Sequence, residues 1–145
     1  MPFPKDFSWG AATASHQIEG GNDNDWTDWE KQNAPRLAQE SEKSFHWNPN
    51  WEKFRSEATD PENYISGSAC DHWNRYTEDF DIVKDLGLDA YRFSIEWSRV
   101  EPTPGQFDEA ALRHYADMLT ALRDRNITPF VTLWHFTLPR WLAER

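Results

Sequence analysis

Hydrophobic and polar positions repeat with two different periods along the chain, and each period predicts one type of secondary structure. Residues 89–97 (DAYRFSIEW) alternate at period two, as expected of a β-strand. Residues 7–15 (FSWGAATAS) and 127–135 (ITPFVTLWH) form two further short strand-like runs. In front of the second and third runs, apolar side chains recur every three or four residues, as on one face of a helix.

Each of the two predicted helices has a polar start and a recognisable stop. We expect Asp71 and Asp108 to cap the two starts, and Gly87 and Asn126 to end the helices in a left-handed conformation. The apolar face of the first helix consists of Trp73, Tyr76, Phe80, Val83 and Leu86. That of the second consists of Leu112, Tyr115, Ala116, Leu119 and Leu122.

Strands that alternate with helices through such short joins pair in parallel, with right-handed crossovers. The expected fold class is therefore α/β. Residues 19–69 interrupt this order, because they show no sustained periodicity and are rich in Asn, Asp, Glu and Ser. We expect a long loop insertion in which only DWTDWEKQ forms a short helix. Four tryptophans argue that this loop is ordered and functional: Trp26, Trp29, Trp47 and Trp51.

Composition excludes several classes of protein. The net charge of −10 disfavours binding to nucleic acid or to an anionic membrane. No run of about 18 apolar residues could span a bilayer, and the first residues lack a secretion-signal pattern, so we expect a cytoplasmic location. Cys70 is the single cysteine, which precludes a disulfide within the chain and a thiolate metal cluster. We expect it to be a packed or helix-start residue.

Arg92 is the first candidate functional residue. In residues 89–97, Tyr91 and Phe93 point towards the covering helices, so Arg92 points to the opposite face, which parallel sheets also bury. A buried guanidinium costs several kcal/mol unless a carboxylate pairs with it. That partner is either Glu96 or a loop acid in a structural ion pair, or a catalytic carboxylate that Arg92 keeps ionised.

His135 ends the third predicted strand, at the edge where ligands bind in α/β folds. It is either a structural histidine or a donor to a sugar hydroxyl, with an adjacent aromatic ring closing the pocket. The spacing of the five histidines matches no metal motif. Glu96 and Glu101 are a weaker candidate for an acid/base pair, because Glu101 follows the strand in a proline-rich turn.

Three motifs together resemble a known family. FSWGAATASHQIEG, the stretch DHWNRYTEDFDIVKDLGLDAYRFSIEWSRVEPTPGQFDEAALRHY, and ITPFVTLWHFTLP are similar to the N-terminal part of family-1 glycoside hydrolases, which are β-glucosidases, β-galactosidases and relatives. The resemblance implies the first three β/α units of a (β/α)8 TIM barrel, incomplete in this chain, with a long Trp-rich loop after strand 1. It implies a retaining β-glycosidase that acts on a β-linked glucoside or related sugar and needs no cofactor.

The resemblance also implies roles for individual residues. Gln17 and His135 correspond to residues that hydrogen-bond hydroxyls of the non-reducing sugar, and Arg92 to the arginine beside the nucleophilic glutamate. Phe136 and Thr137 stand where the family commonly has Trp and Asp. Phe136 is therefore expected to stack on the sugar without offering an indole donor.

Both catalytic carboxylates implied by the resemblance are absent from the sequence. In the family they lie in Asn-Glu-Pro and Glu-Asn-Gly motifs, and neither tripeptide occurs here. We therefore expect both beyond Arg145, in a missing segment or in a complementary polypeptide that carries the remaining barrel strands, and we expect the isolated chain to be inactive. Two alternatives remain, namely a non-catalytic carbohydrate-binding module and a remnant interaction protein.

Overall fold

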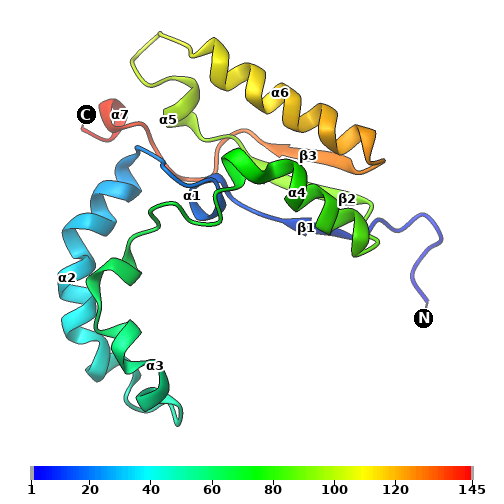
Figure 1. Ribbon diagram of the computed structural model, residues 1–145. Helices are drawn as coiled ribbons and strands as arrows, with labels where there is room; N and C mark the ends of the chain where they lie inside the picture. Colours follow the sequence, from blue (N-terminus) through cyan, green and yellow to red (C-terminus); the bar gives the residue numbers. More distant parts are fainter. Residues whose placement is uncertain (1, 145) are drawn as a thin grey trace.

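Residues 2–144 are described by a computed structural model, which places three short parallel strands and a set of helices (Figure 1). In chain order the elements are β1 (Gly10–Ala12), α1 (Ser15–Ile18), α2 (Asp25–Phe45), α3 (Trp51–Ala58), the 3-10 helix η1 (Pro61–Tyr64), α4 (His72–Asp85), β2 (Ala90–Ser94), α5 (Trp97–Val100), α6 (Glu109–Asp124), β3 (Thr128–Thr132) and α7 (Arg140–Ala143).

The sheet has the order β1-β2-β3 with all pairs parallel, as the alternation of strands and helices predicts. In its register Tyr91 lies beside Ala11 on one side and beside Pro129 on the other. The strands are shorter than predicted. The expected strand 89–97 ends at Ser94, because Trp97 begins helix α5 instead of continuing the helix-facing side of the strand.

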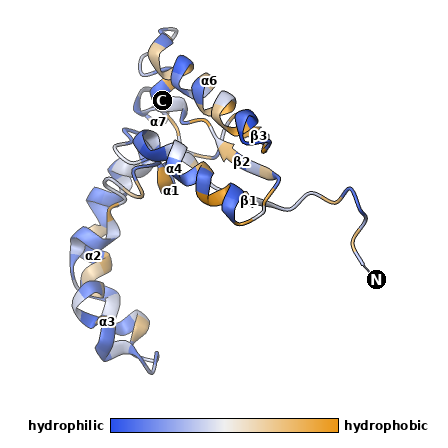
Figure 2. Cartoon of the chain, turned by 45° about the vertical axis from the view of Figure 1, so that its right-hand side comes forward, coloured by the Kyte–Doolittle hydropathy of each residue, from blue (hydrophilic) through white to orange (hydrophobic). Residues whose placement is uncertain are grey.

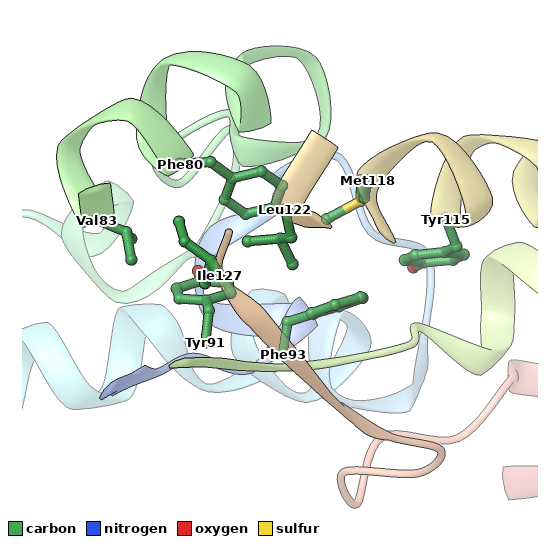
Figure 3. Packing of buried hydrophobic residues seen from close by; sticks show 8 residues of the cluster. All are labelled: Phe80, Val83, Tyr91, Phe93, Tyr115, Met118, Leu122 and Ile127. Atoms are coloured by element: carbon green, nitrogen blue, oxygen red, sulfur yellow. The ribbon is translucent and has the colours of Figure 1, made fainter. Parts of the chain in front are cut away.

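Helices α4 and α6 pack beside each other over one face of the sheet (Figure 1). The predicted alternation of β2 is confirmed, since Tyr91 and Phe93 point into the core between the strand and these helices. Figure 3 shows how the cluster interdigitates. Its members are Phe80, Val83, Tyr91, Phe93, Tyr115, Met118, Leu122 and Ile127. Burial of such side chains contributes roughly 25 cal/mol per Å² of apolar surface.

Three of the four predicted helix ends are confirmed. The Asp108 carboxylate accepts hydrogen bonds from the backbone amides of residues 110 and 111. Gly87 and Asn126 adopt the left-handed conformation after α4 and α6, with φ of 71° and 59°. The prediction that the Asp71 side chain caps a helix start is wrong. Asp71 precedes α4, but its φ is 57° and its side chain accepts from the Asn74 side-chain amide, so it caps no backbone N–H.

The expectation of an irregular loop over residues 19–69 is wrong. This region contains α2, which is 21 residues long, as well as α3 and η1. Figure 1 shows α2 and α3 extending away from the sheet as an arm. The buried face of α2 does repeat every three or four residues, but it is made of small and polar side chains: Thr27, Glu30, Ala34, Ala38 and Ser41. A search for large apolar residues does not detect such a face, and Pro35 inside the helix interrupts the pattern further.

The sheet face opposite α4 and α6 is largely open. Phe130 lies beside Arg92 in the register and is 54% exposed. Figure 2 shows the arm of α2 and α3 coloured largely as hydrophilic. None of the helices within residues 2–144 has the length and apolarity needed to cross a membrane.

The packing of the core predicts that one leucine of helix α6 contributes strongly to the free energy of unfolding. We expect Leu122→Ala to lower the free energy of unfolding by about 3–5 kcal/mol, because Leu122 is fully buried and its truncation leaves a cavity. Leu112→Ala is the matched control on the same helix, where the side chain is 38% exposed, and should cost less than about 1 kcal/mol. Urea unfolding followed by circular dichroism measures both. Equal losses would contradict the assigned core.

Candidate functional site

A cavity of about 490 Å³ opens at the carboxyl ends of the strands. We call it the rim cavity. Two walls face each other across it. The α1 wall comprises residues 14–18 and carries Gln17, and the post-β3 wall comprises residues 135–137 and carries His135 and Phe136. The lining residues are Ala14, His16, Gln17, Asp25, Trp26, His135, Phe136 and Thr137. The three residues expected to bind sugar thus line one cavity, although their roles remain predictions.

Arg92 lies next to this cavity and contacts His135. Its Nη1 is 3.4 Å from His135 Nδ1. The alternative of a structural ion pair with Glu96 or a loop acid is not borne out, since no carboxylate in residues 2–144 lies within ion-pair distance of Arg92. Arg92 is half-buried, because the sheet face on which it stands is open.

Glu96 is fully buried and is held by hydroxyl groups. Ser15 Oγ and Ser98 Oγ each donate to its carboxylate over 3.0 Å, and Thr137 Oγ1 donates over 3.1 Å. Glu101 points elsewhere. It accepts hydrogen bonds from the Gly105 amide and the Trp97 indole, which lower the pKa of Glu101. The two carboxylates therefore have separate partners, and the geometry gives no support to an acid/base pair.

A second buried carboxylate, Glu19, follows the α1 wall. It accepts from Arg99 Nε over 2.9 Å and from the Tyr115 hydroxyl over 2.8 Å. Burial raises the pKa of Glu19 to about 7, and it outweighs the opposing effects of Tyr115 and Arg99. Nearby Glu96 raises the pKa further. Arg99 also lies 4.2 Å from the centre of the Trp73 ring, a cation–π contact that fixes its plane.

Sequence analysis missed a third polar cluster, which joins the α1 wall to helix α2. His16 Nε2 lies 3.0 Å from Glu30, and its Nδ1 lies 3.2 Å from the Asn24 side-chain amide. Ser66 donates to Glu30 through both its hydroxyl and its amide. Desolvation opposes ionisation of Glu30, but the hydrogen bonds from Ser66 and His16 outweigh it and lower the pKa of Glu30.

Trp26, one of the four tryptophans of residues 19–69, also lines the rim cavity. It lies at the start of α2, is 48% exposed, and stacks on Trp29 with ring centres 4.9 Å apart. The start of α2 reaches the cavity because Asp25 N donates to the Leu138 carbonyl over 3.0 Å, and Leu138 N donates to Asp25 Oδ1 over 2.8 Å. An exposed tryptophan face suits the apolar face of a sugar ring.

Phe136 has an unusual backbone. Its φ is +72°, a conformation that bulky residues rarely adopt, and its ring is 76% exposed. The Thr137 amide donates to the His135 carbonyl over 3.0 Å across this turn. Strain of this kind persists where the surrounding structure imposes it, often at ligand sites. No group of three or more His, Cys, Asp or Glu side chains in the described part of the chain is arranged to hold a metal ion.

The family model described as Glycosyl hydrolase family 1 matches residues 1–145. The chain belongs to this family. The predicted resemblance is therefore confirmed over its full extent, and the enzyme class of the relatives is that of glycoside hydrolases.

Several curated relatives of this family-1 chain are named β-glucosidases. Beta-glucosidase 1B of Phanerodontia chrysosporium is 40% identical over 145 residues, which cover 98% of this chain and 24% of the relative. Beta-glucosidase A of Thermotoga maritima is 39% identical over 139 residues, which cover 94% of this chain and 27% of the relative. The chain thus spans about a quarter of the length of these relatives.

Solved family-1 structures share the fold. A beta-glycosidase from Pyrococcus horikoshii matches with a TM-score of 0.74 at 40% identity, covering 99% of this chain and 28% of that structure. The family 1 β-glucosidase from Thermotoga maritima matches with a TM-score of 0.72 at 34% identity. The match covers 98% of this chain and 28% of that structure. The Thermotoga maritima enzyme has also been solved in complex with a methoxycarbonyl-substituted glucoimidazole.

The raised pKa of Glu19 predicts that the fold loses stability as the pH rises. Glu19 binds its proton more tightly when folded than when unfolded, so its contribution is complete below about pH 4.5 and disappears as the pH passes about 7. The expected loss is on the order of 3 kcal/mol. Glu19→Gln should flatten the dependence of the urea midpoint on pH between 5 and 8. A variant with the wild-type slope would show that other groups cause the dependence.

Proposed function

We propose that this segment supplies the sugar-binding part of a retaining β-glycosidase that acts on a β-linked glucoside or related sugar. The observation that carries the proposal is that Gln17, His135 and Phe136 line one cavity at the carboxyl ends of parallel strands. An amide, an imidazole and an aromatic ring are suited to bind hydroxyls and a ring face together. The glucoimidazole complex of the Thermotoga maritima relative supports a glucose-like ligand.

The chemistry is assigned to residues outside 1–145. A retaining glycosidase needs two carboxylates about 5–5.5 Å apart, one as acid/base and one as nucleophile. Asp25 is the single carboxylate among the residues lining the rim cavity, and its Oδ1 accepts from the Leu138 amide. Glu19 and Glu96 are engaged with Arg99 and with hydroxyl groups. We infer that Arg92, which has no ion-pair partner within residues 2–144, receives the nucleophile.

The remaining strands of a (β/α)8 barrel would complete this site, in the same polypeptide or in a complementary one. Two observations support completion. The chain spans about a quarter of its relatives. In addition, Phe130 and Arg92 stand side by side on a sheet face that α4 and α6 leave open. Neighbouring strands would bury the aromatic ring and surround the cation.

Residues 1–145 alone should therefore show no glycoside hydrolysis. We expect no release of nitrophenol from an aryl β-glucoside by the isolated chain, because within residues 2–144 no pair of free carboxylates faces the rim cavity. Joining or mixing it with the rest of a family-1 barrel should restore hydrolysis. The control is the same complemented barrel with Arg92→Ala, for which we expect a loss of at least about 10²-fold in kcat. Hydrolysis by the chain alone, free of contaminating enzyme, would contradict the proposal.

A carbohydrate-binding module is the second candidate, and the observation that favours it is that the rim cavity is formed entirely within this chain. Titration of the isolated chain with glucose, followed through tryptophan fluorescence, separates the two candidates. Saturable binding that Gln17→Ala and His135→Ala each weaken by about tenfold would favour the module. Binding that occurs only in the complemented barrel would favour the glycosidase. Binding to other polypeptides unaffected by either substitution would indicate a remnant interaction protein.

A further inference from the structure

We propose that Glu96 is a positioning residue that fixes the two walls of the rim cavity relative to each other. This inference rests on the proposed function, in which the α1 wall and the post-β3 wall hold one sugar between them. Glu96 touches neither Gln17 nor His135 and does not line the cavity. It acts through the hydroxyl groups of Ser15 and Thr137.

The geometry places the Glu96 carboxylate between the walls. Ser15 Oγ, in the α1 wall, donates to Oε2 over 3.0 Å. Thr137 Oγ1, in the post-β3 wall, lies 3.2 Å from Oε1 and 3.1 Å from Oε2. One side chain that follows the central strand thus bonds to segments that lie 81 residues before it and 41 residues after it.

Burial makes the loss of any of these hydrogen bonds costly. Glu96 has no exposed surface, so an unmade hydrogen bond to its carboxylate is not replaced by water. Hydrogen bonds to a charged acceptor are stronger than neutral ones, and in the interior they are strengthened further. The Ser15 amide also donates to Ser94 Oγ over 2.7 Å, and Ser94 Oγ donates to Ser15 Oγ over 3.1 Å. Ser94 thereby orients the Ser15 hydroxyl towards Glu96.

Gln17 and His135 need this support because their own side chains have few partners. In the described structure the Gln17 side chain makes no hydrogen bond, and His135 contacts Arg92 at 3.4 Å. Their positions therefore follow from the backbone that carries them. A shift of about 1 Å between groups that bind one ligand is enough to lose most of their joint effect.

Glu19 provides a matched comparison. It is another buried carboxylate near the same helix, but its side-chain partners are Arg99 and Tyr115, and neither belongs to the post-β3 wall. If Glu96 had only the structural role of a buried acid, its substitution and that of Glu19 would affect the two walls in the same way. A positioning role for Glu96 makes them different, because only Glu96 joins both walls.

Hydrogen–deuterium exchange of residues 1–145, read by mass spectrometry, tests the proposal without any sugar. Thr137→Val removes the hydroxyl at nearly constant volume, and we expect about tenfold faster exchange in peptides covering 135–138 with no change in α6. Thr137→Ser keeps the hydroxyl and should restore slow exchange. Glu96→Gln should accelerate amide exchange in both walls, whereas Glu19→Gln should accelerate exchange only in the segment around α1. Ser98→Ala, which removes the third hydroxyl, is the control that should leave both walls unchanged.

Exchange that accelerates evenly over the whole chain in Glu96→Gln, or in one wall alone, would overturn the proposal. If Glu96→Gln does not fold, the Thr137→Val and Thr137→Ser pair still decides, since equal exchange at 135–138 in both overturns it. A glucose titration of the same samples separates this result from the proposed function. The expected exchange differences could occur while glucose binds neither to the isolated chain nor to the complemented barrel. That result would refute the sugar site and would still support the linkage of the two walls by Glu96.

Discussion

The alternation of side chains along β2 is the constraint on which the rest of the structure depends. Tyr91 and Phe93 must point into the cluster under α4 and α6, because that is where the apolar surface of the helices lies. The pleat then places Arg92 on the opposite face, and the end of the strand brings Glu96 between the segments that follow β1 and β3. A slip of one residue would bury the guanidinium in the aromatic core and abolish both the core and the site.

Buried polar groups hold the segments around the rim cavity in place, as apolar packing holds the core. Tyr115 connects the two regions, because its ring belongs to the apolar cluster while its hydroxyl accepts from the Glu96 amide and donates to Glu19. Burial and the neighbouring Glu19 raise the pKa of Tyr115, so the hydroxyl keeps the proton that it donates. The rim therefore contains carboxylates that are satisfied internally, which leaves them to hold backbone segments and not to react.

The sequence predicts the sheet and its helices well because their core is made of large apolar residues at regular spacing. The caps at Asp108, Gly87 and Asn126 were predictable for a different reason, since each follows from a local backbone requirement. The start of helix α2 was predicted in DWTDWEKQ, but its extension to Phe45 was not predictable, because Ala34 and Ala38 allow close packing without producing an apolar stripe. The site was predictable only where a motif pointed to it. The hydroxyl contacts of Glu96 join residues far apart in sequence, and no periodicity records them.

The proposed function requires that one sugar site be assembled from two parts of a barrel. The open face beside β2 carries an aromatic ring and a cation, which neighbouring strands of a barrel would cover. A ligand pocket shared between such parts gains from walls that are already fixed before the second part docks, since ordering them later would cost conformational entropy. Apolar contacts slide easily, whereas a buried carboxylate that accepts from hydroxyls on both walls permits one arrangement. Placing the charge behind the walls also keeps it out of the cavity, where it would repel the catalytic carboxylates of the family.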